Sequence, residues 1–266
     1  RLKANAAGAI CATLGLGLLM LPGVVWAALG VELVALAFWL WARSLPDRTR
    51  SQVVHWVGVM VAGMGKFVGL YPRGIRIQTV AEYREYCYYV AGTVGCMLTE
   101  LWHEHAPSVG TAELTRLRTK CEQFGEALQT VNILKDIAHD AEHGSGHLTL
   151  LDEAHGAHNH AAVASFIELA WHDLDDALDY LVMIPRRAVA IRAFCALPLL
   201  FAYATLRDLA SSRLMLRAGG QVKISRAEVK SLTCAGLASL FSNRALRGLV
   251  ERVKRRPFVP FEFGMR

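Results

Sequence analysis

The chain has 266 residues, 53% of them hydrophobic, and a formal net charge of +6. Such a chain can bury a sizeable core, and we expect one large domain rather than two small ones. Its basic residues are scattered over 43–50, 184–192 and 244–256 and form no tract with interleaved aromatics, which argues against sequence-specific nucleic-acid binding and favours an anionic small molecule or an anionic membrane surface as partner.

The cysteines indicate a reducing compartment. None is paired as CxxC, and most lie in apolar helical context, where a free cysteine behaves as a small hydrophobe. We therefore expect reduced thiols and a cytoplasmic location, peripheral to the membrane or anchored in it. The six are Cys11, Cys87, Cys96, Cys121, Cys195 and Cys234.

The first predicted element is a long apolar segment. No charge occurs between Lys3 and Glu32, and the apolar texture continues to Trp41, which is long enough to cross a bilayer. Pro22-Gly23 divides the segment, so two buried helices of a large α-helical protein fit equally well. We predict residues 1–43 as an apolar segment of core or membrane-associated helices, and residues 44–266 as a helical domain.

Two helices are predicted next. After a turn at Ser44-Leu45-Pro46, Asp47 is a candidate cap for a helix that ends near Val68. A longer helix covers about Thr79 to His105, with aromatic and branched residues at helical spacing. Small residues lie among them, and they fit either the wall of an apolar tube or close helix packing. The positions on this helix are Tyr83, Tyr86, Val90, Val94 and Leu98, with Ala91, Gly92 and Gly95 as the small residues.

The remaining elements are also predicted as helices. One begins at Thr111 and ends before Gly144-Ser145-Gly146, and two more cover about 161–183 and 186–210. A last one begins at Ser225, where Glu228 completes a capping-box pattern, and reaches about Lys254. No segment shows sustained strand alternation, so the fold class is all-α.

One stretch of the Thr111 helix can carry chemistry. Asn132, Asp136 and Asp140 are four residues apart, so they share one helix face. Carboxylate and amide oxygens suit Mg²⁺, which commonly bridges a few carboxylates to substrate phosphates. The spacing therefore predicts a Mg²⁺-diphosphate site or, with equal weight, a solvated stripe on an amphipathic helix.

Several motifs in a fixed order resemble the squalene and phytoene synthases. Tyr86-Cys87-Tyr88-Tyr89-Val90-Ala91-Gly92-Thr93-Val94-Gly95 resembles the family's helix motif, and Asn132 through Asp140 its second aspartate-rich motif. Together the similar stretches cover about residues 44–235. The supporting ones are Gly63-Met64 with Phe67, Leu174 through Tyr180, Phe194 through Pro198, and Lys223 through Arg226.

The resemblance implies an isoprenoid-synthase helical bundle around a central apolar cavity. Its implied activity is head-to-head condensation of two prenyl diphosphates, farnesyl or geranylgeranyl, with Mg²⁺ as cofactor and NADPH in addition if the product is squalene. Such a site needs a charged mouth that draws off diphosphate and a dry tunnel that protects a carbocation.

The resemblance also assigns roles to single residues. Asp136 and Asp140, with Asn132, would hold Mg²⁺, and Gln129 and Lys135 would contact the diphosphate. Tyr86 would lie near the reacting carbons as a catalytic residue. The tunnel would be lined by Val90, Ala91, Val94 and Gly95.

The sequence departs from the family pattern in two places. The family carries an earlier Asp-x-x-Glu-Asp motif upstream of the Ser44 turn, whereas Glu32 is the lone acidic residue there. An arginine normally follows the second motif by five residues, and Ser145 occupies that position. A diphosphate would thereby lose a bidentate partner, which His143 or His147 could replace only when protonated.

Three alternatives follow from these observations. The histidines from His139 to His160 could form a transition-metal site, although solvated loop histidines are the ordinary explanation. The chain could be a catalytically impaired family member that acts as a lipid-binding or partner-binding module. It could also be anchored by residues 4–41 spanning the bilayer.

Overall fold

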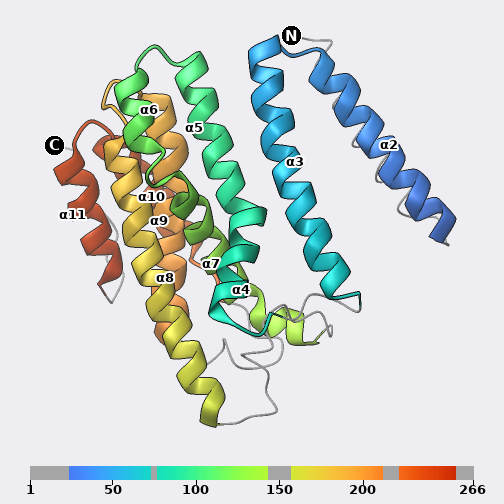
Figure 1. Cartoon of the computed structure of the whole chain (residues 1–266). Helices are drawn as coiled ribbons and strands as arrows, with labels where there is room; N and C mark the ends of the chain where they lie inside the picture. The colour runs from blue at the N-terminus through green and yellow to red at the C-terminus, as the bar shows by residue number, and fades with distance from the viewer. Residues whose placement is uncertain (1–23, 73–76, 143–156, 212–221, 256–266) are drawn as a thin grey trace. The chain divides into compact units, whose positions relative to one another are not determined.

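A computed structural model describes the backbone of residues 24–72, 77–142, 157–211 and 222–255, and the side chains of most of them. Figure 1 shows helices throughout, and no strand element occurs in these ranges, which confirms the all-α prediction. The chain divides into two compact units at Val57/Gly58, a boundary inside helix α3.

The first unit contains α2 (Val24–Arg43) and the beginning of α3 (Asp47–Leu70). The predicted turn at Ser44 is present, because Ser44 N donates to Trp41 O at 2.9 Å. Large apolar side chains remain exposed on α2, including Trp39 at 52% and Leu40 at 55%. By length and composition α3 could cross a membrane, as could α9 (Val189–Ser211), which is half buried and so also fits a core helix. The first apolar piece, before Pro22-Gly23, lies outside the described residues.

The second unit contains the rest of α3 and then the predicted long helix. This helix runs without interruption from α4 (Val80–Cys87) through a π-helical turn, η1 (Tyr88–Gly92), into α5 (Thr93–His105). Thr79 caps it by accepting a hydrogen bond from Glu82 N at 3.1 Å. The helical period predicted the element, but nothing in the spacing distinguished the π turn from α-helix.

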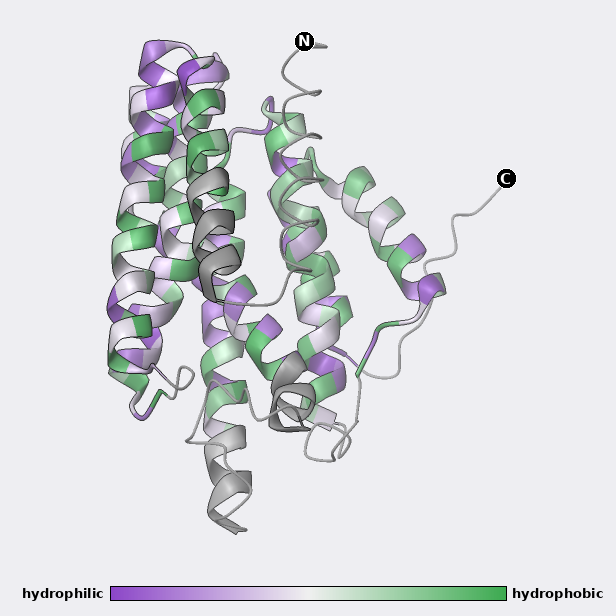
Figure 2. Ribbon diagram, turned by 90° about the vertical axis from the view of Figure 1, so that its right-hand side faces the viewer, coloured by the Kyte–Doolittle hydropathy of each residue, from purple (hydrophilic) through white to green (hydrophobic). Residues whose placement is uncertain are grey.

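The other helices of this unit are α6 (Thr111–Leu117), α7 (Cys121–Glu142), α8 (Ala157–Met183), α9, α10 (Arg226–Ser239) and α11 (Asn243–Lys254). Helix α7 packs against η1, α5, α8 and α9, so it forms the centre of the bundle. Most helices in Figure 2 carry green hydrophobic residues beside white and purple ones, as expected of helices that each bury one face. The buried thiols of Cys96 and Cys121 lie 2.7 Å apart between α5 and α7, and the described cysteines form no disulfide bond.

Two helix predictions were wrong in their continuity. The helix predicted from Thr111 is broken between Leu117 and Cys121, and the last helix is broken between Ser239 and Asn243. At the second break the buried Arg192 guanidinium donates to Leu240 O at 2.7 Å. This long-range hydrogen bond satisfies a helix-terminal carbonyl, which sequence periodicity cannot reveal. The predicted Ser225 cap is present, with Glu228 N donating to Ser225 Oγ at 3.1 Å.

Candidate active site

The Tyr86 motif lies where α4, η1 and α5 pass across α7. A Cβ added at Gly95 would lie 2.0 Å from the carbonyl oxygen of Cys121, and one added at Gly125 would lie 2.0 Å from that of Ala91. No side chain fits at either place, so the two backbones touch. The contact fits the close-packing alternative for the small residue Gly95, while the tunnel-lining roles of Val90, Ala91, Val94 and Gly95 stay predictions.

The side chain of Tyr86 is nearly buried, with 7% of its surface exposed. It meets the fully buried Phe67 of α3 edge to face, with ring centroids 5.3 Å apart and planes at 78°. Edge-to-face pairs hold rings in a defined orientation. Phe67 therefore sets the orientation of the tyrosine to which the family resemblance assigned a catalytic role.

The predicted diphosphate ligands lie on α7. Asn132 is exposed, Gln129 and Lys135 are partly exposed, and Asp136 and Asp140 follow on the same helix. The helical backbone through Glu142 supports the shared face that the i, i+4, i+8 spacing predicts. The side chains of Asp136 and Asp140 lie outside the described part of the chain.

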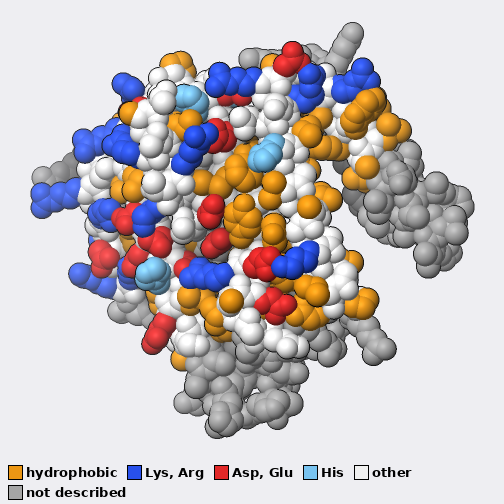
Figure 3. Space-filling model, in the orientation of Figure 1, with side chains coloured by type: hydrophobic (Ala, Val, Ile, Leu, Met, Phe, Trp, Pro, Cys, Tyr) orange, Lys and Arg blue, Asp and Glu red, His pale blue; other side chains and the backbone are white. Residues whose placement is uncertain are grey.

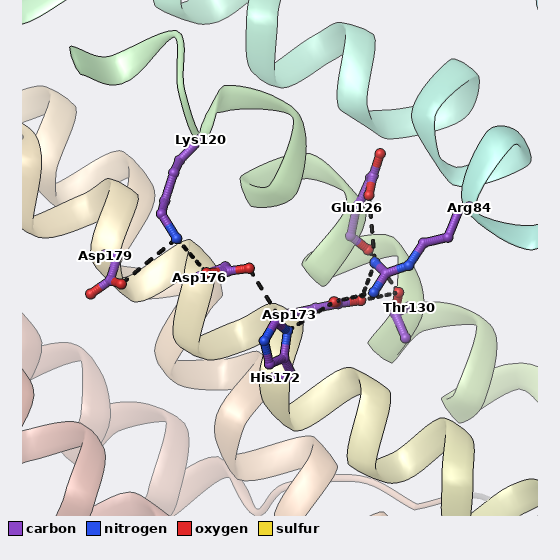
Figure 4. Close-up of polar contacts among 8 residues, drawn as sticks. All are labelled: Arg84, Lys120, Glu126, Thr130, His172, Asp173, Asp176 and Asp179. Atoms are coloured by element: carbon purple, nitrogen blue, oxygen red, sulfur yellow. Dashed lines mark hydrogen bonds and ion pairs between the residues drawn. The ribbon is translucent and has the colours of Figure 1, made fainter. Parts of the chain in front are cut away.

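A charged cluster joins α7 to α4 and α8, and the sequence did not single it out (Figure 4). Arg84 donates two hydrogen bonds to Asp173, at 2.8 and 2.7 Å, and lies 3.6 Å from Glu126. Thr130 donates to Glu126 O at 2.9 Å and lies 3.5 Å from Asp173. The pairing of Arg84 and Asp173 is bidentate, the strongest geometry available to a guanidinium and a carboxylate.

Burial determines the protonation of Glu126 in this cluster. The side chain is 12% exposed, and desolvation raises the pKa of Glu126 to about 7, although the Arg84 charge opposes the rise. Asp173 accepts hydrogen bonds from both terminal nitrogens of Arg84, whereas Glu126 has only the longer contact. The carboxyl group of Glu126 therefore titrates near neutral pH.

Three other carboxylates of α8 are also paired with cations. Lys120 binds Asp176, Lys254 donates to Asp175 at 2.7 Å, and Arg247 donates to Asp179 at 2.7 Å. Acidic and basic side chains are accordingly interspersed on the left of Figure 3, over α8 and α11. The Leu174-to-Tyr180 stretch therefore holds neighbouring helices by ion pairs.

No group of three or more His, Cys, Asp or Glu residues able to hold a metal occurs among the described side chains. The side chains of the proposed histidine site, from His139 to His160, lie outside that set, as do Asp136 and Asp140. The Mg²⁺ and histidine-metal predictions therefore both stay predictions.

A readable signal did exist for the charged cluster. Glu126 and Thr130 are spaced i, i+4 within the apolar period of α7, and both are buried. A charged residue on a buried helix face requires a partner. The sequence could not say that the partners are Arg84 and Asp173, because these come from two other helices.

The sequence and the fold are similar to those of known proteins. A family model described as squalene/phytoene synthase matches residues 37–228. Squalene synthase ERG9 of Candida albicans is 31% identical over 195 residues, which cover 67% of this chain and 41% of that protein. A bifunctional lycopene cyclase/phytoene synthase of Arthroderma gypseum is 45% identical over 69 residues, or 26% of this chain and 12% of that protein.

Solved structures with the same fold include TcSQS in complex with the ligand BPH1237. It matches with a TM-score of 0.68 at 20% identity, covering 83% of this chain and 64% of that one. TcSQS in complex with E5700 matches with a TM-score of 0.64 at 19% identity, over 83% of this chain and 72% of that one. The chain thus spans about two fifths of ERG9 and about two thirds of the solved relatives.

Proposed function

Because this chain belongs to the squalene/phytoene synthase family, we propose that it is a prenyl transferase that condenses two prenyl diphosphates head to head. The single observation that carries the proposal is the backbone contact of Gly95 and Gly125 across α5, η1 and α7. That contact brings the helix of Tyr86 against the helix of Asn132, Asp136 and Asp140. A group for the reacting carbons and a group for the diphosphate thereby come from adjoining helices.

The polar end of the site is assigned to α7. Asp136 and Asp140, with Asn132, would hold Mg²⁺, and Gln129 and Lys135 would donate to diphosphate oxygens. Mg²⁺, when bound, neutralises the charge that develops on departing diphosphate. The oxygen-only donor set on one helix face fits a hard cation that keeps part of its water shell.

The apolar end of the site is assigned to Tyr86. Its buried ring presents electron density that stabilises a cationic carbon, and its phenol hydroxyl donates a hydrogen bond to a departing diphosphate oxygen. Its contact with Phe67 limits ring rotation. The burial of both side chains excludes water, which would otherwise capture the carbocation.

The substrates proposed are farnesyl or geranylgeranyl diphosphate, whose long isoprenoid tails favour a site near a lipid surface. Support for membrane association comes from α2 and α3, where Trp39, Leu40, Val61 and Val68 are each more than half exposed. Apolar side chains in that number are costly in water and favourable at a bilayer interface.

An assay of diphosphate release tests the proposal. The chain is incubated with farnesyl or geranylgeranyl diphosphate and Mg²⁺, and inorganic diphosphate and the isoprenoid product are measured. We expect Asp136→Ala to reduce release by about 100-fold or more, because it removes a charge-stabilising ligand group. Asp179→Asn, on an α8 carboxylate paired with Arg247, is the matched control and keeps wild-type rates.

A folded chain that releases no diphosphate, and that Asp136→Ala leaves unchanged, would overturn the proposal. Binding of a prenyl diphosphate without turnover would instead identify the lipid-binding module considered from the sequence. The membrane part is tested separately by co-sedimentation with anionic vesicles. Failure to sediment, with α2 intact, contradicts it.

A further inference from the structure

Gly63 on α3 contacts the aromatic ring of Tyr89, which belongs to the helix that carries Tyr86. A Cβ added at Gly63 would lie 2.1 Å from Cγ and from Cδ1 of Tyr89, and 2.5 Å from its Cδ2. These distances are far below a van der Waals contact, so the Tyr89 ring rests directly against the backbone of α3. The neighbouring Gly65 has no atom within 4 Å of the same position, which makes the contact specific to Gly63.

Tyr89 is held in place from the other side. It belongs to the π turn η1, and Thr93 Oγ1 donates to its carbonyl oxygen at 2.9 Å. Two residues further on, Ala91 O touches the backbone at Gly125. The backbone of Tyr89 therefore cannot retreat towards α7, and a clash at Gly63 would have to displace the ring.

The ring of Tyr89 lies next to Phe67, which orients the catalytic Tyr86. Phe67 lies one helical turn after Gly63 and meets Tyr86 at 5.3 Å and Tyr89 at 6.5 Å between ring centroids, both edge to face. Phe67 has no exposed surface. A displaced Tyr89 would therefore push on a ring that has no space to move except against Tyr86.

We propose that Tyr89, seated on Gly63, is a positioning residue that fixes the Phe67 and Tyr86 rings for the coupling reaction. The inference deepens the proposed function and rests on it. Glycine is required at position 63 because its missing side chain makes room for the Tyr89 ring, and not for backbone freedom. Tyr89 acts through the two other rings.

The decisive variant is Gly63→Ala, with Gly65→Ala as its matched control on the same helix. We expect Gly63→Ala to lower kcat by about 10-fold to 100-fold with a much smaller change in KM, because misplacing a reacting group affects the transition state more than binding. Gly65→Ala retains wild-type kcat. Equal kcat values for the two variants would overturn the proposal.

A double-mutant cycle separates positioning from general damage. Tyr89→Ala also lowers kcat, but it removes the ring with which the new Cβ of Gly63→Ala would clash. Adding Gly63→Ala to the Tyr89→Ala variant therefore causes no further loss of kcat. Tyr89→Phe keeps the ring and retains kcat. Fully additive losses for Gly63→Ala and Tyr89→Ala would contradict a contact between them. If Gly63→Ala alone folds poorly, equal kcat values for Tyr89→Ala and Tyr89→Phe would still overturn the positioning role.

A structural readout makes the inference independent of turnover. Nuclear Overhauser contacts between the Phe67 and Tyr86 rings are expected in the wild-type chain and in Gly65→Ala, and are weakened in Gly63→Ala and Tyr89→Ala. If the wild-type chain proves inactive but the contacts follow this pattern, the proposed function fails and the seating of the rings stands. If the contacts between the Phe67 and Tyr86 rings are unchanged in both Gly63→Ala and Tyr89→Ala, the positioning role is contradicted.

Discussion

Helix α7 is held by two interfaces built on different physical principles. Towards η1 and α5 the contact is steric, because Gly95 and Gly125 bring backbone against backbone. Towards α4 and α8 the contact is electrostatic, because Arg84, Glu126 and Asp173 meet there. One helix therefore carries one contact that does not depend on pH or salt and another that protons and salt can change.

The difference shows how steric contact can fix the position of α7 while its charged contacts still respond to pH and salt. The steric interface sets the distance between the helix of Tyr86 and that of Asn132, since backbone atoms cannot interpenetrate. The charged interface turns the Glu126 and Thr130 face of α7 towards α4 and α8, since Glu126 lies 3.6 Å from Arg84 and Thr130 lies 3.5 Å from Asp173. The experiments below break each interface in turn.

The largest effect is expected from Gly125→Ala. Its new Cβ would meet the Ala91 carbonyl at 2.0 Å, and both partners are backbone, so the helices must separate. We expect a loss of about 3 kcal/mol in the free energy of unfolding, measured by urea titration. Gly65→Ala, which meets no atom within 4 Å, should gain up to about 1 kcal/mol from helix propensity. Similar unfolding midpoints for the two variants would show that the steric interface is not tight.

A smaller effect is expected from Asp173→Asn. It leaves the part-buried Arg84 without its bidentate anion, which costs about 2 kcal/mol in the free energy of unfolding. Arg247→Ala, which breaks the exposed pair with Asp179, should cost no more than about 0.5 kcal/mol. The same urea titrations measure both. If the two losses are equal, the buried pair contributes no more than a surface one.

The smallest effect is a pH dependence that comes from Glu126. Its pKa is about 7 in the folded chain, against an ordinary value of 4.5, so the folded state binds the proton more tightly. Its contribution to stability is complete below the ordinary value and is lost as the pH rises through about 7. Relative to Glu126→Gln, which cannot titrate, the wild type should lose on the order of 1 kcal/mol between about pH 5 and pH 8. Parallel stability curves for the two proteins would show that Glu126 does not titrate there.

The helical elements could be predicted because their information is local. The helical spacing of apolar residues predicted the helix that ends at His105, and Ser225 with Glu228 predicted the start of α10. The break after Leu117 contains neither Gly nor Pro. Local propensity therefore missed it. Within the break, the Lys120 side chain binds Asp176 of α8.

The order of motifs from Gly63 to Arg226 determined the family, since each motif is a run of adjacent residues. Tertiary structure alone decided that Gly95 is a packing residue, that Gly63 seats Tyr89, and that Asp173 belongs to Arg84. These facts join residues 26 or more positions apart. They depend on how each helix is rotated about its axis, and that rotation is set by all of its neighbours at once.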